Sequence, residues 1–387
     1  MAKDLIGNPD YPAISYGGYR KNSRDQQPTI AQLKEDLRIL EAMNIKLLRT
    51  YNTNLPHATN LVKAIHELKA EDPDFEMYVM LGAWIDCRDA WTDHPNHDEE
   101  DAEANAAEIQ RAVDLANTYP DIIKIIAVGN EAMVKWAAAY FVQPWVILKY
   151  VNQLQDMKKA GDLPAGLWVT SSDNFASWGG GGEEYHVPDL EKLIRAVDFI
   201  SLHTYPMHDT HYNPDFWGVA EVESNLPEED QIEAAMDRAL AYAKNQYQST
   251  ADYVRSLGVE KPIHIGETGW ASASNEHYGP EGSRATDEYK EALYYRRMRQ
   301  WTNQESITCF YFEAFDEPWK DAQNPGGSEN HFGLLTVDGR AKYALWDLVD
   351  QGVFEGLTRG GQPISKTYQG DESALMEEVL LPPVKDL

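Results

Sequence analysis

Two glutamates in this sequence follow apolar runs and lie in glycine-containing turns. Glu131 follows Ile125-Ile126-Ala127-Val128-Gly129-Asn130, and Glu267 follows Ile263-His264-Ile265-Gly266. Glycoside hydrolysis needs such a pair, because a protonated carboxyl donates to the leaving oxygen while an ionised carboxylate attacks the anomeric carbon. A single glutamate of this kind would be interpreted as a surface acid or an ion-pair partner. Two in matching positions favour cleavage of a glycosidic bond.

Amides, acids and aromatic side chains lie at the ends of the other apolar runs. Aromatic rings stack on sugar faces and polar side chains bond to sugar hydroxyls, so this composition is typical of a carbohydrate site. Each aromatic residue could instead belong to the core. The residues predicted to bind a sugar are Tyr51, Trp84, Asp173, Asn174, His203, Trp270, Glu313 and Trp319.

The histidines near the sixth apolar run raise the alternative of a zinc site. His203, His208 and His211 lie close together in the sequence, with Asp209 among them. Strand geometry does not bring three of these side chains together, so His203 is interpreted as a hydrogen-bonding wall residue. We therefore predict no metal and no other cofactor.

Eight short apolar runs alternate with helical segments, and these elements must position the two glutamates. The predicted strands lie near residues 13–16, 45–51, 77–84, 122–128, 167–171, 199–205, 262–265 and 309–315. The predicted helices span 29–43, which Thr29 would cap, and 54–69, 100–118, 144–159, 227–257 and 286–303. Near-continuous apolar strands separated by helices indicate a parallel sheet that is covered on both faces.

This alternation predicts an α/β fold, a closed (β/α)8 TIM barrel. An open doubly wound sheet is the alternative, but it usually has fewer strands and a glycine-rich phosphate turn after the first strand, which this sequence lacks. In a parallel barrel the active site lies at the C-terminal ends of the strands. Strands four and seven lie roughly across the barrel mouth, so Glu131 and Glu267 can flank one bound bond.

The chain of 387 residues is predicted to form a single catalytic domain, 1–387, because such barrels routinely reach about 250 residues or more. The extension 351–387 has little periodicity and is expected to pack on the barrel or trail from it, as a strap or a disordered end. The glycine-rich run 179–182 is a candidate mobile lid. The loops expected to elaborate the barrel mouth are 86–98, 175–187 and 206–227.

Composition excludes several classes of partner. The 63 acidic residues outnumber 34 basic ones, and the net charge of −29 disfavours nucleic acids and anionic membranes and favours a neutral substrate. The acidity is interpreted as a surface that favours solubility, as in a saline habitat, and a large calcium site is the minor alternative. No stretch approaches about 18 apolar residues, so we predict no membrane insertion, and the first residues do not read as a signal peptide. Cys87 and Cys309 are expected to be reduced and buried.

The motifs around the two glutamates resemble those of glycoside hydrolase family 17, whose members are β-1,3-glucanases. Gly129-Asn130-Glu131 is shared across the wider clan, whereas Gly266-Glu267-Thr268-Gly269-Trp270 is more specific to the family. The resemblance spans about residues 13–346, and we expect a bacterial member. One departure, Ala271-Ser272 in place of Pro then Ser or Thr, is interpreted as a changed loop conformation. Other matching segments are Leu48-Arg49-Thr50-Tyr51, Val197-Asp198-Phe199-Ile200, residues 310–317 and His331-Phe332-Gly333-Leu334.

The resemblance implies roles for the residues around the two acids. Glu131 would be the general acid/base and Glu267 the nucleophile of a retaining mechanism, with their carboxyl groups about 5–5.5 Å apart. Asn130 is expected to hold the sugar 2-hydroxyl, Tyr205 to orient Glu267, and Arg49 to keep Glu267 ionised by lowering its pKa. By the same resemblance, the residues that support the site near the cleft are Glu317, Lys320 and Glu329.

The substrate that the resemblance implies is a β-1,3-glucan of the laminarin type, as an oligosaccharide or polysaccharide. A sugar acceptor in place of water would make the same site a transglycosylase. A clan relative acting on mannan or a β-1,4-glucan, or a non-catalytic carbohydrate-binding barrel, would also carry some of these residues, and endo and exo action both stay open. A polymer substrate places the protein outside the cell, in a periplasm or on a cell surface, and we expect a monomer.

Overall fold

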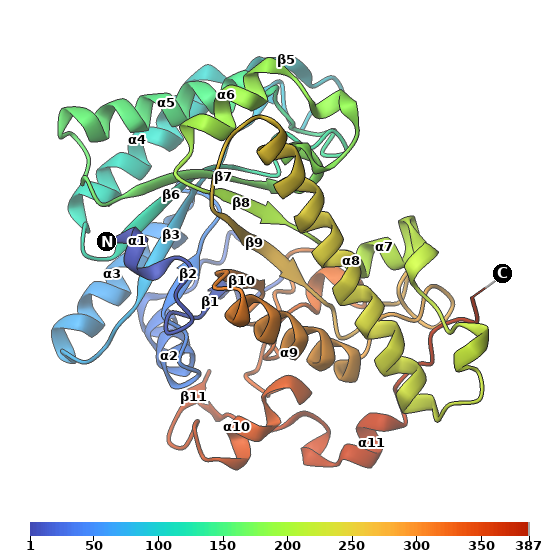
Figure 1. Cartoon of the computed structure of the whole chain (residues 1–387). Coiled ribbons are helices and arrows are strands. Elements are labelled where there is room, and N and C mark those ends of the chain that lie inside the picture. The colour runs from blue at the N-terminus through green and yellow to red at the C-terminus, as the bar shows by residue number, and fades with distance from the viewer. Residues whose placement is uncertain (386–387) are drawn as a thin grey trace.

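Eight parallel strands close into a barrel in the computed structural model, which describes residues 1–385 (Figure 1). The order around the barrel is β1-β10-β9-β8-β7-β6-β3-β2, so each strand neighbours the one before it in the barrel series. The predicted (β/α)8 TIM barrel is therefore confirmed. Its strands are β1 (Ala13–Ser15), β2 (Leu47–Arg49), β3 (Tyr78–Ala83), β6 (Ile123–Asn130), β7 (Trp168–Asn174), β8 (Ile200–His203), β9 (Ile263–Gly269) and β10 (Cys309–Phe312).

Helices cover the outside of the barrel. The six predicted ones are present as α2 (Ile30–Ala42), α3 (Pro56–Glu71), α4 (Ala102–Thr118), α5 (Pro144–Ala160), α8 (Glu228–Ser256) and α9 (Glu288–Gln304). Thr29 caps α2 as expected, because its hydroxyl accepts the backbone N–H of Gln32. The sequence did not reveal the short α6 (Pro188–Ala196) and α7 (Pro206–Tyr212), each of which starts at a proline.

The interior of the barrel is apolar at one end and polar at the other. At the N-terminal ends of the strands, inward side chains pack with two residues of the N-terminal segment, which begins with α1 (Ala2–Leu5) and closes that end. This cluster consists of Ala2, Ile6, Ala13, Leu47, Met80, Ile125, Ala127, Phe199 and Phe310. Towards the C-terminal ends the buried residues are polar, as at Arg49, Ser172 and His203. The open end is thus the one that can bind a ligand.

Several elaborations surround the open end. A small antiparallel hairpin, β4 (Cys87–Arg88) with β5 (Asn96–Glu100), occupies the predicted loop 86–98. The glycine-rich run is packed down, because a Cβ at Gly179 would overlap the ring of Tyr253 on α8, and Gly179 itself has a φ of +90°. This close approach requires glycine there, and it disfavours the idea that 179–182 is a mobile lid.

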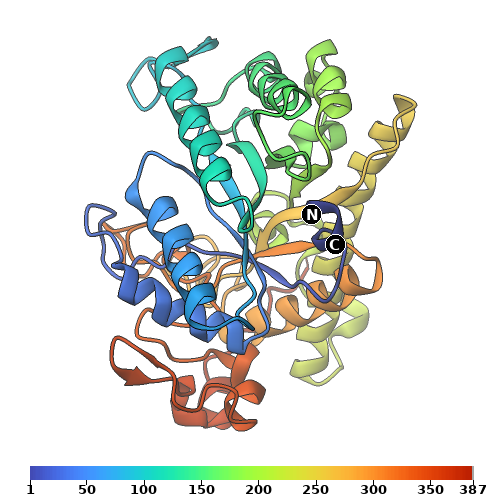
Figure 2. The same cartoon turned by 90° about the vertical axis from the view of Figure 1, so that its left-hand side faces the viewer.

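The C-terminal extension lies against the barrel throughout its described part. After α10 (Trp346–Asp350), the short pair β11 (Thr358–Arg359) and β12 (Gln362–Pro363) contacts α2, and α11 (Glu372–Met376) contacts α9 (Figures 1 and 2). Arg359 is fully buried and pairs with Asp36 of α2 at 2.8 Å. Near the end, Val384 bridges to Val219 in the loop after α7. Residues 351–385 therefore form a strap rather than a trailing tail.

Both cysteines, Cys87 and Cys309, are buried and free, as expected from the sequence. Among the described residues, no helix combines the length and apolar character that crossing a membrane requires.

Candidate active site

Glu131 and Glu267 meet in one cleft at the open end of the barrel. Glu131 directly follows the last residue of β6, and Glu267 lies within β9, at the far side of β7 and β8 around the barrel. Both glutamates line the same hollow. Glu131 has a φ of +47°, a left-handed conformation that costs a residue with a Cβ about 1–3 kcal/mol and is concentrated at functional sites.

Three donors converge on the Glu267 carboxylate. Tyr205 donates to Oε1 at 2.6 Å, while Tyr51 at 2.8 Å and the Arg49 guanidinium at 2.5 Å donate to Oε2. Burial alone would raise the pKa of Glu267, but the nearby positive charge and the two tyrosine hydroxyls outweigh it and lower the pKa to about 2. His203 contributes only when protonated, and burial lowers its own pKa to about 4. At neutral pH, Arg49 and the hydroxyls therefore keep Glu267 ionised.

Arg49 ties the ends of two strands to the site. Its side chain is 1% exposed, donates to the Gly266 carbonyl at 2.9 Å and to Asn130 Oδ1 at 2.5 Å, and lies 4.6 Å above the ring of Tyr51. The side-chain oxygen of Asn130 accepts the hydrogen bond from Arg49, and the residue lines the cleft. Its amide nitrogen is the group left to face a ligand.

Glu131 has the opposite environment. Its Oε1 lies 3.1 Å from Nδ1 of His203, a ring that is neutral near pH 7. Burial, followed by the negative charge of Glu267, raises the pKa of Glu131 to about 8. At neutral pH one carboxyl of the pair thus keeps its proton and the other is ionised, the asymmetry that acid/base chemistry requires. His203 is fully buried beneath Glu131 and is not the wall residue that the sequence suggested.

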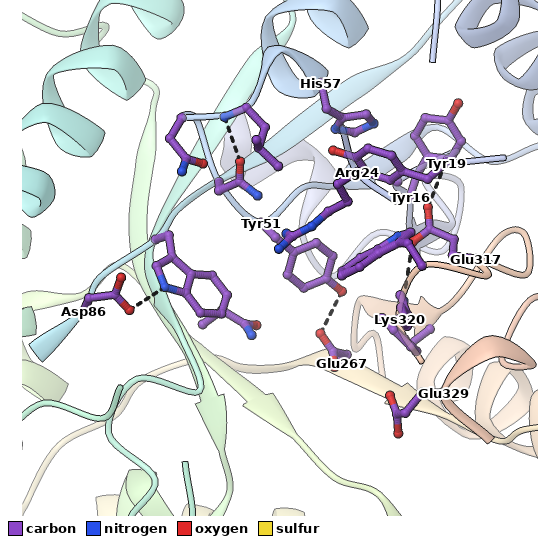
Figure 3. A pocket seen from close by; sticks show the side chains of 18 of the residues that line it. Tyr16, Tyr19, Arg24, Tyr51, His57, Asp86, Glu267, Glu317, Lys320 and Glu329 are labelled. Atoms are coloured by element: carbon purple, nitrogen blue, oxygen red, sulfur yellow. Dashed lines mark hydrogen bonds and ion pairs between the residues drawn. The ribbon is translucent and has the colours of Figure 1, made fainter. Parts of the chain in front are cut away.

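The cleft consists of two hollows that share Glu267, Phe312 and Glu329. The first, of about 650 Å³, is seen from close by in Figure 3, where Tyr51 points at Glu267 and Asp86 accepts from a neighbouring indole. Its lining includes the predicted residues Tyr51, Trp84, Asn130, Glu317, Trp319, Lys320 and Glu329. The second, of about 820 Å³, includes the predicted residues Glu131, Asn174 and Tyr205.

The supporting residues form a charged cluster on one wall. Lys320 pairs with Glu313 at 2.7 Å and lies 3.7 Å above the ring of Phe312. Glu317 lies 3.5 Å from Lys320 and accepts the backbone N–H of Tyr19 at 2.9 Å, which holds the loop after β1 against the cleft. Glu329 instead lies 3.7 Å from His208, on the side of the second hollow.

Three predicted sugar contacts are wrong, because the side chains are buried away from the cleft. Trp270 is fully buried and donates its indole N–H to the carbonyl of Ala285 behind β9. Asp173 is also fully buried and accepts the backbone N–H of Met133 at 2.7 Å, which braces the turn after Glu131. Glu313 is 2% exposed and forms an ion pair with Lys320. Tyr51 was expected to stack on a sugar, but its hydroxyl is committed to Glu267.

Several cleft residues were not predicted from the sequence. Trp91 is 60% exposed, stacks on Tyr140 with 4.9 Å between ring centroids, and shares the Asp86 carboxylate with Trp84. Trp136 is 63% exposed and lines the second hollow, together with Tyr212. For Trp91 the available signal was a tryptophan within a polar loop, between Asp89 and Asp93; Trp136 lies in an apolar stretch and gave no such signal.

The three histidines of the zinc alternative have separate partners. His203 contacts Glu131, His208 approaches Glu329, and His211 stacks on His277. Within residues 1–385, no group of three or more His, Cys, Asp or Glu side chains is placed to hold a metal ion.

Comparison with known proteins identifies a family model and solved structures that are similar to this chain. Residues 13–333 match the model of the BtgE/BtgC glycoside hydrolase domain. A solved endo-laminarinase from Formosa Hel1_33_131 is 68% identical over 100% of this chain and 98% of that one, with a TM-score of 0.99. A Rhizomucor miehei β-1,3-glucanosyltransferase of glycoside hydrolase family 17 is 22% identical over 87% of this chain and 96% of that one (TM-score 0.57), a likeness of fold alone.

Curated relatives are longer proteins. The Aspergillus flavus protein named "Probable glucan endo-1,3-beta-glucosidase btgC" is 23% identical over 89% of this chain but only 45% of its own length. The corresponding Aspergillus niger protein is 24% identical over 80% of this chain and 39% of its own length. The chain thus spans less than half of these relatives. Because the family model matches residues 13–333, the chain belongs to the BtgE/BtgC glycoside hydrolase domain family.

Proposed function

We propose that this chain is a retaining endo-β-1,3-glucanase of glycoside hydrolase family 17 that hydrolyses laminarin-like polymers. The observation that carries the proposal is the pair of glutamates with opposite environments in one cleft. Glu131 has a pKa raised to about 8 and Glu267 a pKa lowered to about 2. A general acid and a nucleophile that act at the same neutral pH need this difference.

In the first step, Glu131 donates its proton to the glycosidic oxygen while a Glu267 oxygen attacks the anomeric carbon. The bond from that carbon to the leaving oxygen breaks, and a covalent glycosyl ester forms on Glu267. In the second step, Glu131 takes a proton from water, whose oxygen attacks the same carbon and releases Glu267 as a carboxylate. Two displacements at one carbon retain its configuration, and they need carboxyl groups about 5–5.5 Å apart.

The electrostatic coupling between the two glutamates supports this change of role. The charge of Glu267 helps to raise the pKa of Glu131. Once Glu267 is esterified, that charge is gone and the pKa of Glu131 falls, because the largest electrostatic cause of its raised pKa has been removed. Glu131 is then a carboxylate when a base is needed. Arg49 and the hydroxyls of Tyr51 and Tyr205 favour release of Glu267 as an anion.

The two hollows indicate in which orientation a glucan chain would bind along the cleft. Asn130, which would hold the 2-hydroxyl of the attacked sugar, lines the first hollow, and Glu131 lines the second. The first would therefore bind the glycone and the second the leaving group. Space on both sides of Glu267 suits cleavage within a chain, which favours endo over exo action.

The substrate class rests on the relatives. The Formosa protein, 68% identical over the whole chain, is named an endo-laminarinase, and the Aspergillus flavus relative carries a glucan endo-1,3-β-glucosidase name. A transglycosylase using the same residues is the second candidate, because the second hollow could hold a sugar acceptor as well as a leaving group. We further infer a single catalytic domain, 1–387, including the extension 351–387, and a monomer of bacterial origin that works outside the cytoplasm.

The test uses Glu131→Gln and Glu267→Gln against laminarin, with mannan and cellulose as comparison polymers. We expect reducing ends from laminarin alone with the native chain, loss of activity by about 10²-fold or more in each variant, and a first product that keeps the β configuration by NMR. Native-like laminarin turnover by either variant would contradict its assignment. Products longer than the starting oligosaccharides would favour the transglycosylase.

A further inference from the structure

A chain of three buried polar side chains lies behind Glu131. His203 Nδ1 is 3.1 Å from Glu131 Oε1, and His203 Nε2 is 2.7 Å from Ser172 Oγ. Ser172 Oγ is in turn 2.8 Å from Ser201 Oγ. All three members, His203, Ser172 and Ser201, are completely buried. Among residues 1–385, the side chains of this group form hydrogen bonds only with one another and with Glu131.

Three neighbouring strands, β7, β8 and β9, surround this group of side chains. Ser172 lies on β7, and Ser201 and His203 alternate on β8 so that both face the same side. Gly266 on β9 faces them, and a Cβ there would overlap both serine hydroxyls. Glycine at 266 thus keeps open the space that the two hydroxyls occupy, directly before the nucleophile Glu267.

Counting protons decides the direction of the hydrogen bonds. If Ser201 donates to Ser172, Ser172 donates to His203 Nε2, and His203 Nδ1–H donates to Glu131, every proton has an acceptor. In the reverse direction His203 Nε2–H donates to Ser172, Ser172 donates to Ser201, and the Ser201 proton finds no further acceptor within residues 1–385. A buried donor without a partner costs about 1–3 kcal/mol. The first direction is therefore favoured.

We propose that Ser201, Ser172 and His203 form a directional chain of hydrogen bonds, called the relay here although it transfers no proton. This chain fixes the Nδ1–H tautomer of His203 and so directs the catalytic proton to Oε2 of Glu131. Since Nδ1–H occupies Oε1, the proton of Glu131 must sit on the other oxygen, which is the one left to face the substrate. This inference rests on the proposed acid/base role of Glu131. His203, Ser172 and Ser201 are positioning residues, because they act through Glu131.

One tautomer serves both steps. When Glu131 is protonated, Nδ1–H bonds to its carbonyl-like oxygen, and when Glu131 is a carboxylate, the same Nδ1–H bonds to an anion. The ring need not exchange its proton during turnover. The relay is thus a fixed support rather than a path for proton transfer.

The test compares Ser172→Ala with Ser171→Ala. Ser171 lies beside it on β7, is equally buried, and has a hydroxyl with no hydrogen-bond partner among residues 1–385, so it is a matched control. Both are assayed as kcat/KM on laminarin, whose sugar leaving group needs a proton, and on 2,4-dinitrophenyl β-laminaribioside, whose leaving group does not. General acid catalysis contributes about 10²–10⁴-fold, and a misplaced proton forfeits part of it.

For Ser172→Ala we expect a loss of about 10- to 100-fold on laminarin and less than about 2-fold on the dinitrophenyl substrate, whereas Ser171→Ala stays within about 2-fold on both. An equal loss on both substrates, or no difference from Ser171→Ala, would overturn the relay. Glu131→Gln separates the two proposals: if it too loses activity equally on both substrates, the acid assignment itself fails.

A second measurement does not depend on activity. The nitrogen-15 shifts of labelled histidine, with His203→Asn used to identify the signal, distinguish a ring protonated at Nδ1 from one protonated at Nε2. We expect Nδ1–H for His203 in the native chain near pH 7. An Nε2–H ring would refute the proposed direction even if Ser172→Ala were impaired.

Discussion

Removing the hydroxyl of Tyr205 should move the acidic limb of the pH–activity profile. Tyr205 donates to Glu267 Oε1 at 2.6 Å, and the ionised carboxylate is the active form. A hydrogen bond to a charged group contributes about 1.5–3 kcal/mol, and one pKa unit corresponds to about 1.36 kcal/mol. Tyr205→Phe should therefore raise the pKa of Glu267 by about 1–2 units, from about 2.

The sign follows from the charge of the nucleophile. Activity is lost as the pH falls through the pKa of Glu267, so a raised pKa moves the limb to higher pH. The assay is kcat/KM on soluble laminarin from about pH 3 to 8, where the native enzyme should stay flat down to about pH 3 and Tyr205→Phe should decline below about pH 4. Near pH 7 the variant should still hold an ionised Glu267.

Tyr294→Phe is the matched control. Its hydroxyl is also buried and lies 2.7 Å from the hydroxyl of Thr268 on β9, next to the nucleophile but without contact to its carboxylate. This variant should leave the acidic limb in place. If Tyr205→Phe and Tyr294→Phe gave the same limb as the native chain, the claim that hydroxyl donors hold Glu267 ionised would be wrong.

Further outcomes follow from the same contacts. The basic limb of kcat/KM should lie near the pKa of Glu131, about 8, because activity is lost as its proton is lost; a profile flat to about pH 10 would contradict this. Arg359→Met removes one of the two arginines that pair with the fully buried Asp36, Arg20 being the other at 2.7 Å, and should lower unfolding free energy by about 1.5–3 kcal/mol, whereas Arg340→Met, at an exposed pair, should change it by less than about 1 kcal/mol; equal denaturant midpoints would refute the strap's role. Trp136→Ala removes an exposed ring of the second hollow and should raise KM for long laminarin oligosaccharides by about 3- to 30-fold at unchanged melting temperature, an effect that an unchanged KM would rule out.

The barrel and the two glutamates could be predicted because both follow from simple periodic rules. Near-continuous apolar runs between amphipathic helices leave few topologies besides a closed parallel barrel. The rule that strand C-termini meet at one end then selects the residues after each run. Glu131, Glu267, Arg49 and Tyr205 all meet there in the structure.

Whether a side chain at a strand end points into the cleft or is buried away from it could not be predicted in the same way. A slip of one residue moves a side chain to the opposite face, and the register shifts between Leu202 and His203 and again between Cys309 and Tyr311. Trp270 and Glu313 lie one residue past the ends of β9 and β10, where the alternation of faces no longer applies. One signal was available, because Ser201 and His203 are two residues apart within β8 and therefore share a face.

The central claim is that Glu267 forms a covalent bond to the sugar, and direct observation of that bond tests it best. The native chain is incubated with 2-deoxy-2-fluoro-β-laminaribiosyl fluoride, whose fluorine slows release of the glycosyl-enzyme, and the digested protein is analysed by mass spectrometry. We expect a single added glycosyl group on the peptide that contains Glu267, and none in Glu267→Gln. A label on Glu131, or hydrolysis with inverted configuration and no adduct, would contradict the claim.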